Sequence, residues 1–138
     1  MTVAMGTERA PTAADRASVL AVDDQPPFLA LLRELVGATS HLELIGEAES
    51  GERAVAVAAE LRPDMVLMDL NMPGVSGLKA AELIQAADPS TLMVLISAIR
   101  PDDMPPRAGG CAEAVIWKGV LEPRLLDEIW LRHHPVEG

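Results

Sequence analysis

The sequence predicts a single α/β domain in which a parallel sheet is covered by helices on both faces. Short apolar runs alternate along the chain with longer stretches whose apolar residues recur every three or four positions, as expected of strands that alternate with amphipathic helices. The apolar runs contain almost no polar residues, which is typical of strands buried on both sides of a parallel sheet. The length of 138 residues suits one domain.

Five apolar runs are expected to form strands, and four periodic stretches are expected to form helices. The expected strands are residues 19–22, 42–46, 65–68, 92–96 and 114–117. The expected helices are residues 26–37, 50–62, 78–88 and 123–132. Together they place the folded domain at residues 18–132, with a loose N-terminal tail at 1–17 and a short C-terminal tail at 133–138.

Each element has its own signal. The first strand is apolar and partly β-branched and ends on two acids. Pro26 and Pro27 suit the first turn of the first helix, whose amide groups have no partner within the helix. That helix closes at Gly37, and the second helix stops at Pro63. Between Ser97 and Glu113 the topology requires a fourth crossover helix, but residues 100–110 hold three prolines and two glycines. We therefore expect that helix to be short or irregular.

Composition and charge exclude several classes of function. The formal net charge is −10, which repels phosphate backbones and anionic lipid, so we expect no direct binding to nucleic acid or membranes. Cys111 is the only cysteine, which excludes an internal disulfide and a cysteine-based zinc site. No apolar run is long enough to span a bilayer, and no secretory signal is evident. A cytoplasmic location is expected.

Polar residues follow four of the five expected strands. They are Asp23 and Asp24 after the first strand, Asp69 after the third, Ser97 after the fourth and Lys118 after the fifth. In a parallel α/β sheet, ligands bind beyond the carboxyl ends of the strands. Three carboxylates at that edge would repel one another unless a cation compensates, and Lys118 is one of only two lysines in the chain.

The chemistry of this set points to a magnesium site and a phosphorylated aspartate. Ligands that are all oxygens fit a hard ion such as Mg²⁺, and the turn after Asp69 adds a backbone carbonyl, most simply that of Asn71. A carboxylate beside Mg²⁺ can attack phosphorus and become an aspartyl phosphate. The metal and a lysine would neutralise the phosphoryl oxygens, and a serine hydroxyl could hydrogen-bond a third oxygen.

Residues 19–132 resemble the receiver domain of bacterial two-component response regulators. The resemblance rests on the segments VLAVDDQ and MVLMDLNMPGVSG, on the ISA step and on the IWK ending. The stretch GEAESGERAV is similar to receivers of the NarL/FixJ type. The resemblance implies a flavodoxin-like (CheY-like) sheet of strand order 2-1-3-4-5, phosphorylation by a sensor histidine kinase, and no enzymatic role beyond assisting its own phosphorylation and dephosphorylation.

The resemblance also assigns roles to individual residues. It makes Asp69 the phosphoacceptor, Ser97 the switch hydroxyl and Lys118 the phosphoryl contact. Magnesium would be held directly by Asp24 and Asp69, through water by Asp23, and by the carbonyl of Asn71. Two positions depart from the usual pattern: Val115 replaces a frequent aromatic residue, and Gly119 replaces a frequent proline.

Only 20 residues follow Lys118, so a stand-alone regulator that signals through protein–protein contacts is expected, with a homodimer as one form of assembly. Two alternatives stay open: an interaction module that does not depend on phosphorylation, and a receiver cut from a longer DNA-binding regulator. An aspartyl-phosphate phosphatase of the haloacid dehalogenase type is disfavoured. Those enzymes need a second acid two residues after the nucleophile, where this chain has Asn71.

Overall fold

Five apolar segments form one parallel sheet in the computed structural model, which describes residues 16–72, 77–98 and 114–133. The strands are β1 (Ala17–Val22), β2 (Leu42–Ala48), β3 (Met65–Asp69), β4 (Leu92–Ser97) and β5 (Ala114–Trp117). Their order across the sheet is β2-β1-β3-β4-β5, and each neighbouring pair is parallel. The predicted fold class and strand order are confirmed.

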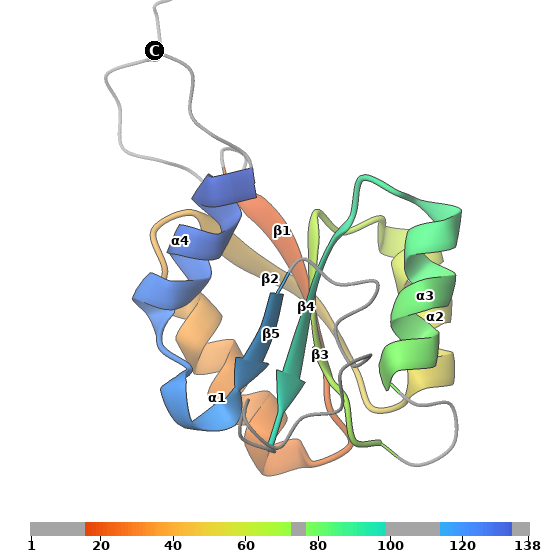
Figure 1. Ribbon diagram of the computed structural model, residues 1–138, viewed down its shortest axis with the longest axis horizontal. Coiled ribbons are helices and arrows are strands. Elements are labelled where there is room, and N and C mark those ends of the chain that lie inside the picture. The colour runs from red at the N-terminus through yellow and green to blue at the C-terminus, as the bar shows by residue number, and fades with distance from the viewer. Residues whose placement is uncertain (1–15, 73–76, 99–113, 134–138) are drawn as a thin grey trace, which may run out of the picture.

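Two layers of helices enclose this sheet (Figure 1). The helices are α1 (Pro26–Gly37), α2 (Gly51–Leu61), α3 (Gly77–Ala87) and α4 (Pro123–His133). Figure 1 shows α1 and α4 on one face and α2 and α3 on the other. The hydrophobic core is divided in the same way, since one cluster joins the strands to α1 and α4, and a second joins them to α2 and α3.

The central strands contain almost no polar residues because they are buried on both faces. Every residue of β3 and of β4 is buried. Along β1 the side chains alternate between the two clusters, with Val19 in the first and Leu20 in the second. Because helices cover both faces, both sets of alternating positions must be apolar.

The limits of four strands differ from the prediction: β3 and β4 each extend one residue further, to Asp69 and Ser97, and β1 and β2 are each two residues longer. β1 begins at Ala17, inside the segment that the sequence assigned to the tail, because the Ala17 N–H donates to the His41 carbonyl at 2.9 Å. β2 continues to Ala48, since its pairing with β1 extends to Val22 opposite Ala48 after an irregularity between Val19 and Leu20. The differences in β1 and β2 come from pairing between strands, which the pattern of a single run does not reveal.

Several sequence predictions fall outside the described residues. They are the fourth crossover helix, expected between Ser97 and Glu113, and most of the two tails. Within the described parts of the chain, no helix is long and apolar enough to cross a membrane.

Two aspartates link elements that are far apart in sequence. Asp127 of α4 accepts hydrogen bonds from the backbone N–H groups of Ser40 (2.8 Å) and His41 (2.9 Å), which precede β2. Asp64, just before β3, accepts from the backbone N–H and the hydroxyl of Ser18 in β1. These bonds fix α4 against the α1–β2 connection and β3 against β1.

Candidate functional site

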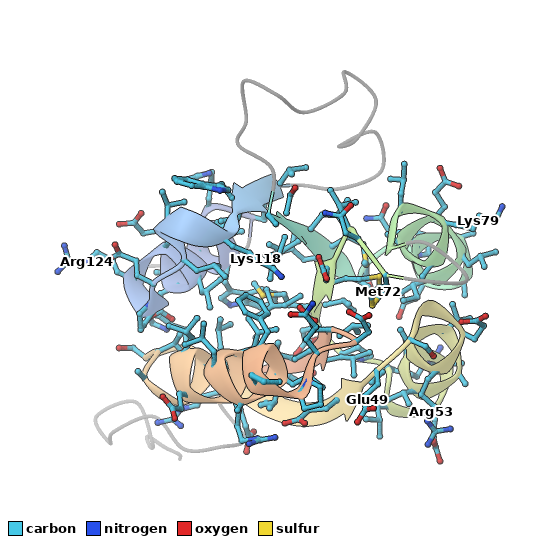
Figure 2. All side chains as sticks on the ribbon, turned by 90° about the horizontal axis from the view of Figure 1, so that it is seen from below. Glu49, Arg53, Met72, Lys79, Lys118 and Arg124 are labelled. Carbon is cyan, nitrogen blue, oxygen red and sulfur yellow. The ribbon has the colours of Figure 1, made fainter. Side chains whose placement is uncertain are left out.

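The carboxyl edge of the sheet brings together the polar residues that follow the strands. Asp23 comes directly after β1, Asp69 ends β3, Ser97 ends β4, and Lys118 begins η3 (Lys118–Val120), the short 3₁₀ helix after β5. Figure 2 shows the molecule from this side, with Lys118 near the middle and Lys79 and Arg124 at the periphery. The fold therefore gathers these side chains because parallel strands end at a common edge.

Three carboxylates form an acidic cluster of Asp23, Asp24 and Asp69. One oxygen from each lies within 4.8 Å of the others. Asp23 and Asp69 are buried, and Asp24 is half-buried. Backbone N–H groups satisfy part of the cluster, since that of Gln25 donates to Asp23 Oδ1 at 2.9 Å and that of Asn71 donates to Asp69 Oδ1 at 3.2 Å.

The electrostatics of the cluster favour a bound cation. Burial raises the pKa of Asp69 above its ordinary value, the hydrogen bond from Asn71 lowers it, and the charge of Asp23 raises it again. Asp23 Oδ2 and Asp24 Oδ1 are buried and accept no hydrogen bond. Buried carboxylate oxygens that accept no hydrogen bond are costly, so these atoms and their all-oxygen chemistry fit a hard divalent cation such as Mg²⁺.

Lys118 is the cation that the chain itself supplies. Its Nζ lies 3.6 Å from Asp23 Oδ2 and 3.9 Å from Asp69 Oδ2. The side chain is only 23% exposed. When the three carboxylates are ionised, a single ammonium does not balance them, and the cluster keeps a net negative charge.

The remaining predicted residues, Ser97 and Asn71, lie at the same edge but differ in exposure. Ser97 is buried, and because Asp69 pairs with Ile96, Ser97 stands one residue beyond that pair on the neighbouring strand. Asn71 is exposed, and its backbone N–H is bonded to Asp69. All six predicted site residues thus lie around one edge, and direct contacts to Asp69 are described for Asn71 and Lys118.

Two residues at this edge were not singled out from the sequence. A Cβ on Gly77 would overlap the carbonyl oxygen of Asp69 and come within 2.9 Å of Leu70 Cα, so glycine lets the start of α3 approach the end of β3. Phe28 of α1 places its ring 4.1 Å from Lys118 Nζ, measured to the ring centroid. The sequence shows Gly77 after Asp69 and Phe28 after two prolines, but the contacts arise only in the fold.

The two departures in the β5 region have structural counterparts. Val115 is half-buried and packs against the core cluster beneath α2 and α3. Gly119 is exposed, and a Cβ there would come within 2.6 Å of the Trp117 ring. The absence of a side chain at 119 therefore leaves room for Trp117 to fold over the backbone of η3.

Comparison with protein families assigns the domain to a known family. The response regulator receiver domain matches residues 19–129, which cover most of the chain and every element of the site. The chain belongs to this family. Receiver domains are signalling domains of two-component systems, they bind Mg²⁺ at an acidic cluster, and they are phosphorylated by histidine kinases.

Individual relatives support the assignment. The response regulator GacA of Pseudomonas viridiflava is 35% identical over 89 residues, which are 64% of this chain and 42% of GacA. The nitrate/nitrite response regulator NarL of Escherichia coli K12 is 33% identical over 81 residues, which are 59% of this chain and 38% of NarL. The match to NarL agrees with the similarity noted from the sequence. The matched part spans less than half of either relative.

A solved structure shows the same architecture. The response regulator domain of Thermotoga maritima CheB superposes on this receiver domain with a TM-score of 0.75 at 26% identity. The match covers 89% of this chain and 99% of that one. The described residues therefore have the flavodoxin-like receiver fold.

Proposed function

We propose that this receiver domain is a phosphoryl-accepting switch of a two-component phosphorelay, with Asp69 as the phosphoacceptor. The observation that carries the proposal is the position of the Asp69 carboxylate. It lies at the end of a buried central strand, within 4.8 Å of two other carboxylates and 3.9 Å from the Lys118 ammonium. Asp69 ends the middle strand of the five and lies near both the other acids and the lysine.

Magnesium would be held by the acidic cluster and by the backbone carbonyl of Asn71. Asp24 and Asp69 would contact the ion directly and Asp23 through water. The buried oxygens of Asp23 and Asp24 that accept no hydrogen bond support this assignment. Bound Mg²⁺ would supply positive charge for the oxygens of the transferring phosphoryl group.

The chain's own groups perform the transfer around that charge. An oxygen of Asp69 attacks the phosphorus of a phosphohistidine on the kinase, forming a P–O bond while the P–N bond breaks and the imidazole leaves. Lys118 is already close enough to Asp69 to contact the arriving phosphoryl oxygens, and the Ser97 hydroxyl would donate to another. A separate hydrolysis step removes the group: water attacks phosphorus, the bond between phosphorus and the Asp69 oxygen breaks, and inorganic phosphate leaves with the Asp69 carboxylate restored.

The proposed partners follow from this chemistry. A sensor histidine kinase donates the phosphoryl group in the cytoplasm, and the phosphorylated domain signals by protein–protein contact rather than by catalysing a reaction on another substrate. The switch suits a stand-alone regulator. It equally suits the receiver part of a longer regulator, since the matched part covers 42% of GacA.

A small-molecule phosphodonor tests the proposal without the kinase. The intact protein is incubated with acetyl phosphate, with and without Mg²⁺, and its mass is measured. We expect a gain of one phosphoryl group that requires Mg²⁺ and is lost in Asp69→Asn. Asp88→Asn, the same substitution at the end of α3, should leave the gain intact. No Mg²⁺-dependent gain in the native protein would favour an interaction module that does not depend on phosphorylation.

A further inference from the structure

Phe28 is the only phenylalanine in the chain, and its ring lies against the lysine of the site. The Lys118 Nζ is 4.1 Å from the ring centroid. A cation within about 6 Å of an aromatic face is attracted by the ring quadrupole, and the attraction grows as water is excluded. Lys118 is largely shielded from solvent, so we expect its attraction to the ring to be stronger than that of a fully exposed pair.

The ring is held in place by its own surroundings. Pro26 and Pro27 fix the backbone of the first turn of α1, and the N–H of Phe28 donates to the Gln25 carbonyl at 3.0 Å. The side chain is half-buried and packs against the core cluster under α1 and α4. Phe28 is therefore a fixed surface against which a flexible side chain can rest.

Lys118 needs such a surface because its carboxylate contacts are long. Its distances of 3.6 Å to Asp23 and 3.9 Å to Asp69 exceed the roughly 2.7–2.9 Å of a charge-assisted hydrogen bond. A lysine stem also has many rotamers. The two carboxylates attract the ammonium from one side without fixing its position, and the ring provides a third contact.

We propose that Phe28 is a positioning residue for Lys118: its aromatic face holds the ammonium beside Asp23 and Asp69, in the place from which it contacts the phosphoryl group. The second part of this inference rests on the proposed function. An aliphatic residue at position 28 would fill similar space but would not attract the charge. The aromatic character of the side chain, rather than its size, is the feature that matters.

A spectroscopic test addresses the contact itself. The full chain is labelled with ¹³C-lysine, which gives signals from two residues, Lys79 and Lys118, and Lys79→Arg identifies its own signal by removing it. Protons above an aromatic face are shifted upfield. We expect the Lys118 Hε signal to move downfield in Phe28→Leu and to keep its native position in Phe28→Tyr, because only leucine removes the ring. An unchanged Lys118 signal in Phe28→Leu would overturn the inference.

A kinetic test addresses the positioning role. With Mg²⁺ and acetyl phosphate, Phe28→Leu should be labelled about 3- to 10-fold more slowly than the native protein, while Phe28→Tyr should stay within about twofold. Equal rates for Phe28→Leu and the native protein, or equally slow rates for both variants, would overturn the role. Circular dichroism confirms that each variant is folded, and Phe28→Met replaces Phe28→Leu if the latter is not.

The two tests separate this inference from the proposed function. If the native protein accepts no phosphoryl group, the proposed function fails and the Lys118 signal alone decides whether Phe28 holds the ammonium. If the native protein is labelled and the Lys118 signal does not respond to the loss of the ring, the inference fails and the proposed function stands.

Discussion

Asp69 is a carboxyl group in a place that disfavours its ionised form. It is 4% exposed, and burial raises its pKa above the ordinary value, with the neighbouring charge of Asp23 adding to the effect. The N–H of Asn71 and the ammonium of Lys118 act in the opposite direction. The ionised form of Asp69 is therefore unfavourable in the empty site. A bound cation would balance its charge, and esterification by a phosphoryl group would remove the carboxylate.

This raised pKa makes stability depend on pH in a defined direction. The folded state keeps a proton on Asp69 to a higher pH than the unfolded chain does, since the ordinary pKa of this carboxyl group is 3.8. The resulting stabilisation is complete below that value and is lost as the pH rises through the raised pKa. Asparagine does not ionise, so Asp69→Asn does not lose stability as the pH rises. Without Mg²⁺ and at neutral pH, we expect Asp69→Asn to melt above the native protein, by about 4 °C for each 1 kcal/mol.

Thermal unfolding in a chelator across a pH series measures this difference. The difference in melting temperature between Asp69→Asn and the native protein should narrow as the pH falls toward the ordinary pKa of 3.8. A native protein that is the more stable of the two at neutral pH would show that Lys118 and Asn71 outweigh burial.

Magnesium should stabilise the folded protein through the same acids. A ligand at about 100 times its Kd adds about 2.7 kcal/mol to the free energy of unfolding. Asp23→Asn keeps an oxygen for the Gln25 N–H but lowers the charge of the cluster, so we expect most of this gain to disappear. Glu49→Gln removes an exposed charge outside the cluster, so this variant should keep the stabilisation by Mg²⁺.

Sodium chloride of matched ionic strength is the reference for this experiment, because salt screens a net charge of −10 without binding at a site. Equal stabilisation of Asp23→Asn and the native protein by Mg²⁺ would place the metal elsewhere.

Among the elements, the start of α3 approaches the site most closely. A methyl group on Gly77 would overlap the backbone of Asp69 and Leu70, which cannot turn aside as a flexible side chain can. The closest contact of a methyl group on Gly46 would be Leu61 Cδ1 at 2.7 Å, the end of an exposed side chain. We expect Gly77→Ala to cost about 1–3 kcal/mol and Gly46→Ala less than about 1 kcal/mol.

Urea denaturation of both glycine variants, with Gly37→Ala as a third, measures these costs. Gly37 has nothing within 4 Å of a Cβ and should be close to neutral. A Gly77→Ala variant as stable as Gly37→Ala would contradict the close approach of α3 to β3.

A single carboxylate links α4 to the α1–β2 connection. Asp127 accepts two backbone hydrogen bonds from residues 40 and 41, and hydrogen bonds to charged groups are worth about 1.5–3 kcal/mol each when shielded. Since these bonds are partly exposed, we expect Asp127→Ala to cost about 1–3 kcal/mol in total. Glu128→Ala, at the exposed neighbour, should stay within about 0.5 kcal/mol. Similar urea midpoints for the two variants would contradict the link.

At the scale of elements, local patterns predicted well what local interactions determine. The apolar runs located all five strands, and Pro26 and Gly37 marked the two ends of α1 as the structure has them. The ends of β1 and β2 were missed because they depend on pairing between Ala17 and the loop before Leu42, and between Val22 and Ala48. Such pairings join residues that are distant in sequence.

At the scale of the whole molecule, the topology explains how much of the site was predictable. Once the strands are parallel, the residues after them must share an edge, so the acids and Lys118 could be placed together from sequence. The Phe28–Lys118 contact joins the first turn of α1 to the end of β5, and no periodicity relates those two segments. The Asp127 link between α4 and the α1–β2 connection was unpredictable for the same reason.

The molecule as a whole also explains the charge balance. The net charge of −10 includes a compact acidic cluster whose negative charge a bound cation would reduce, and the one lysine at that cluster lies over an aromatic ring. The sheet supports this arrangement by burying β3 and β4 completely behind the site. A rigid core and a charged edge are the two parts that a switch of this kind requires.

Locating the phosphoryl group tests the central claim most directly. The protein is treated with acetyl phosphate and Mg²⁺, then with borohydride, which reduces an aspartyl phosphate to homoserine, and its peptides are sequenced by tandem mass spectrometry. We expect homoserine at position 69 only when Mg²⁺ is present. Homoserine at Asp23 or Asp24, or at no position, would contradict it.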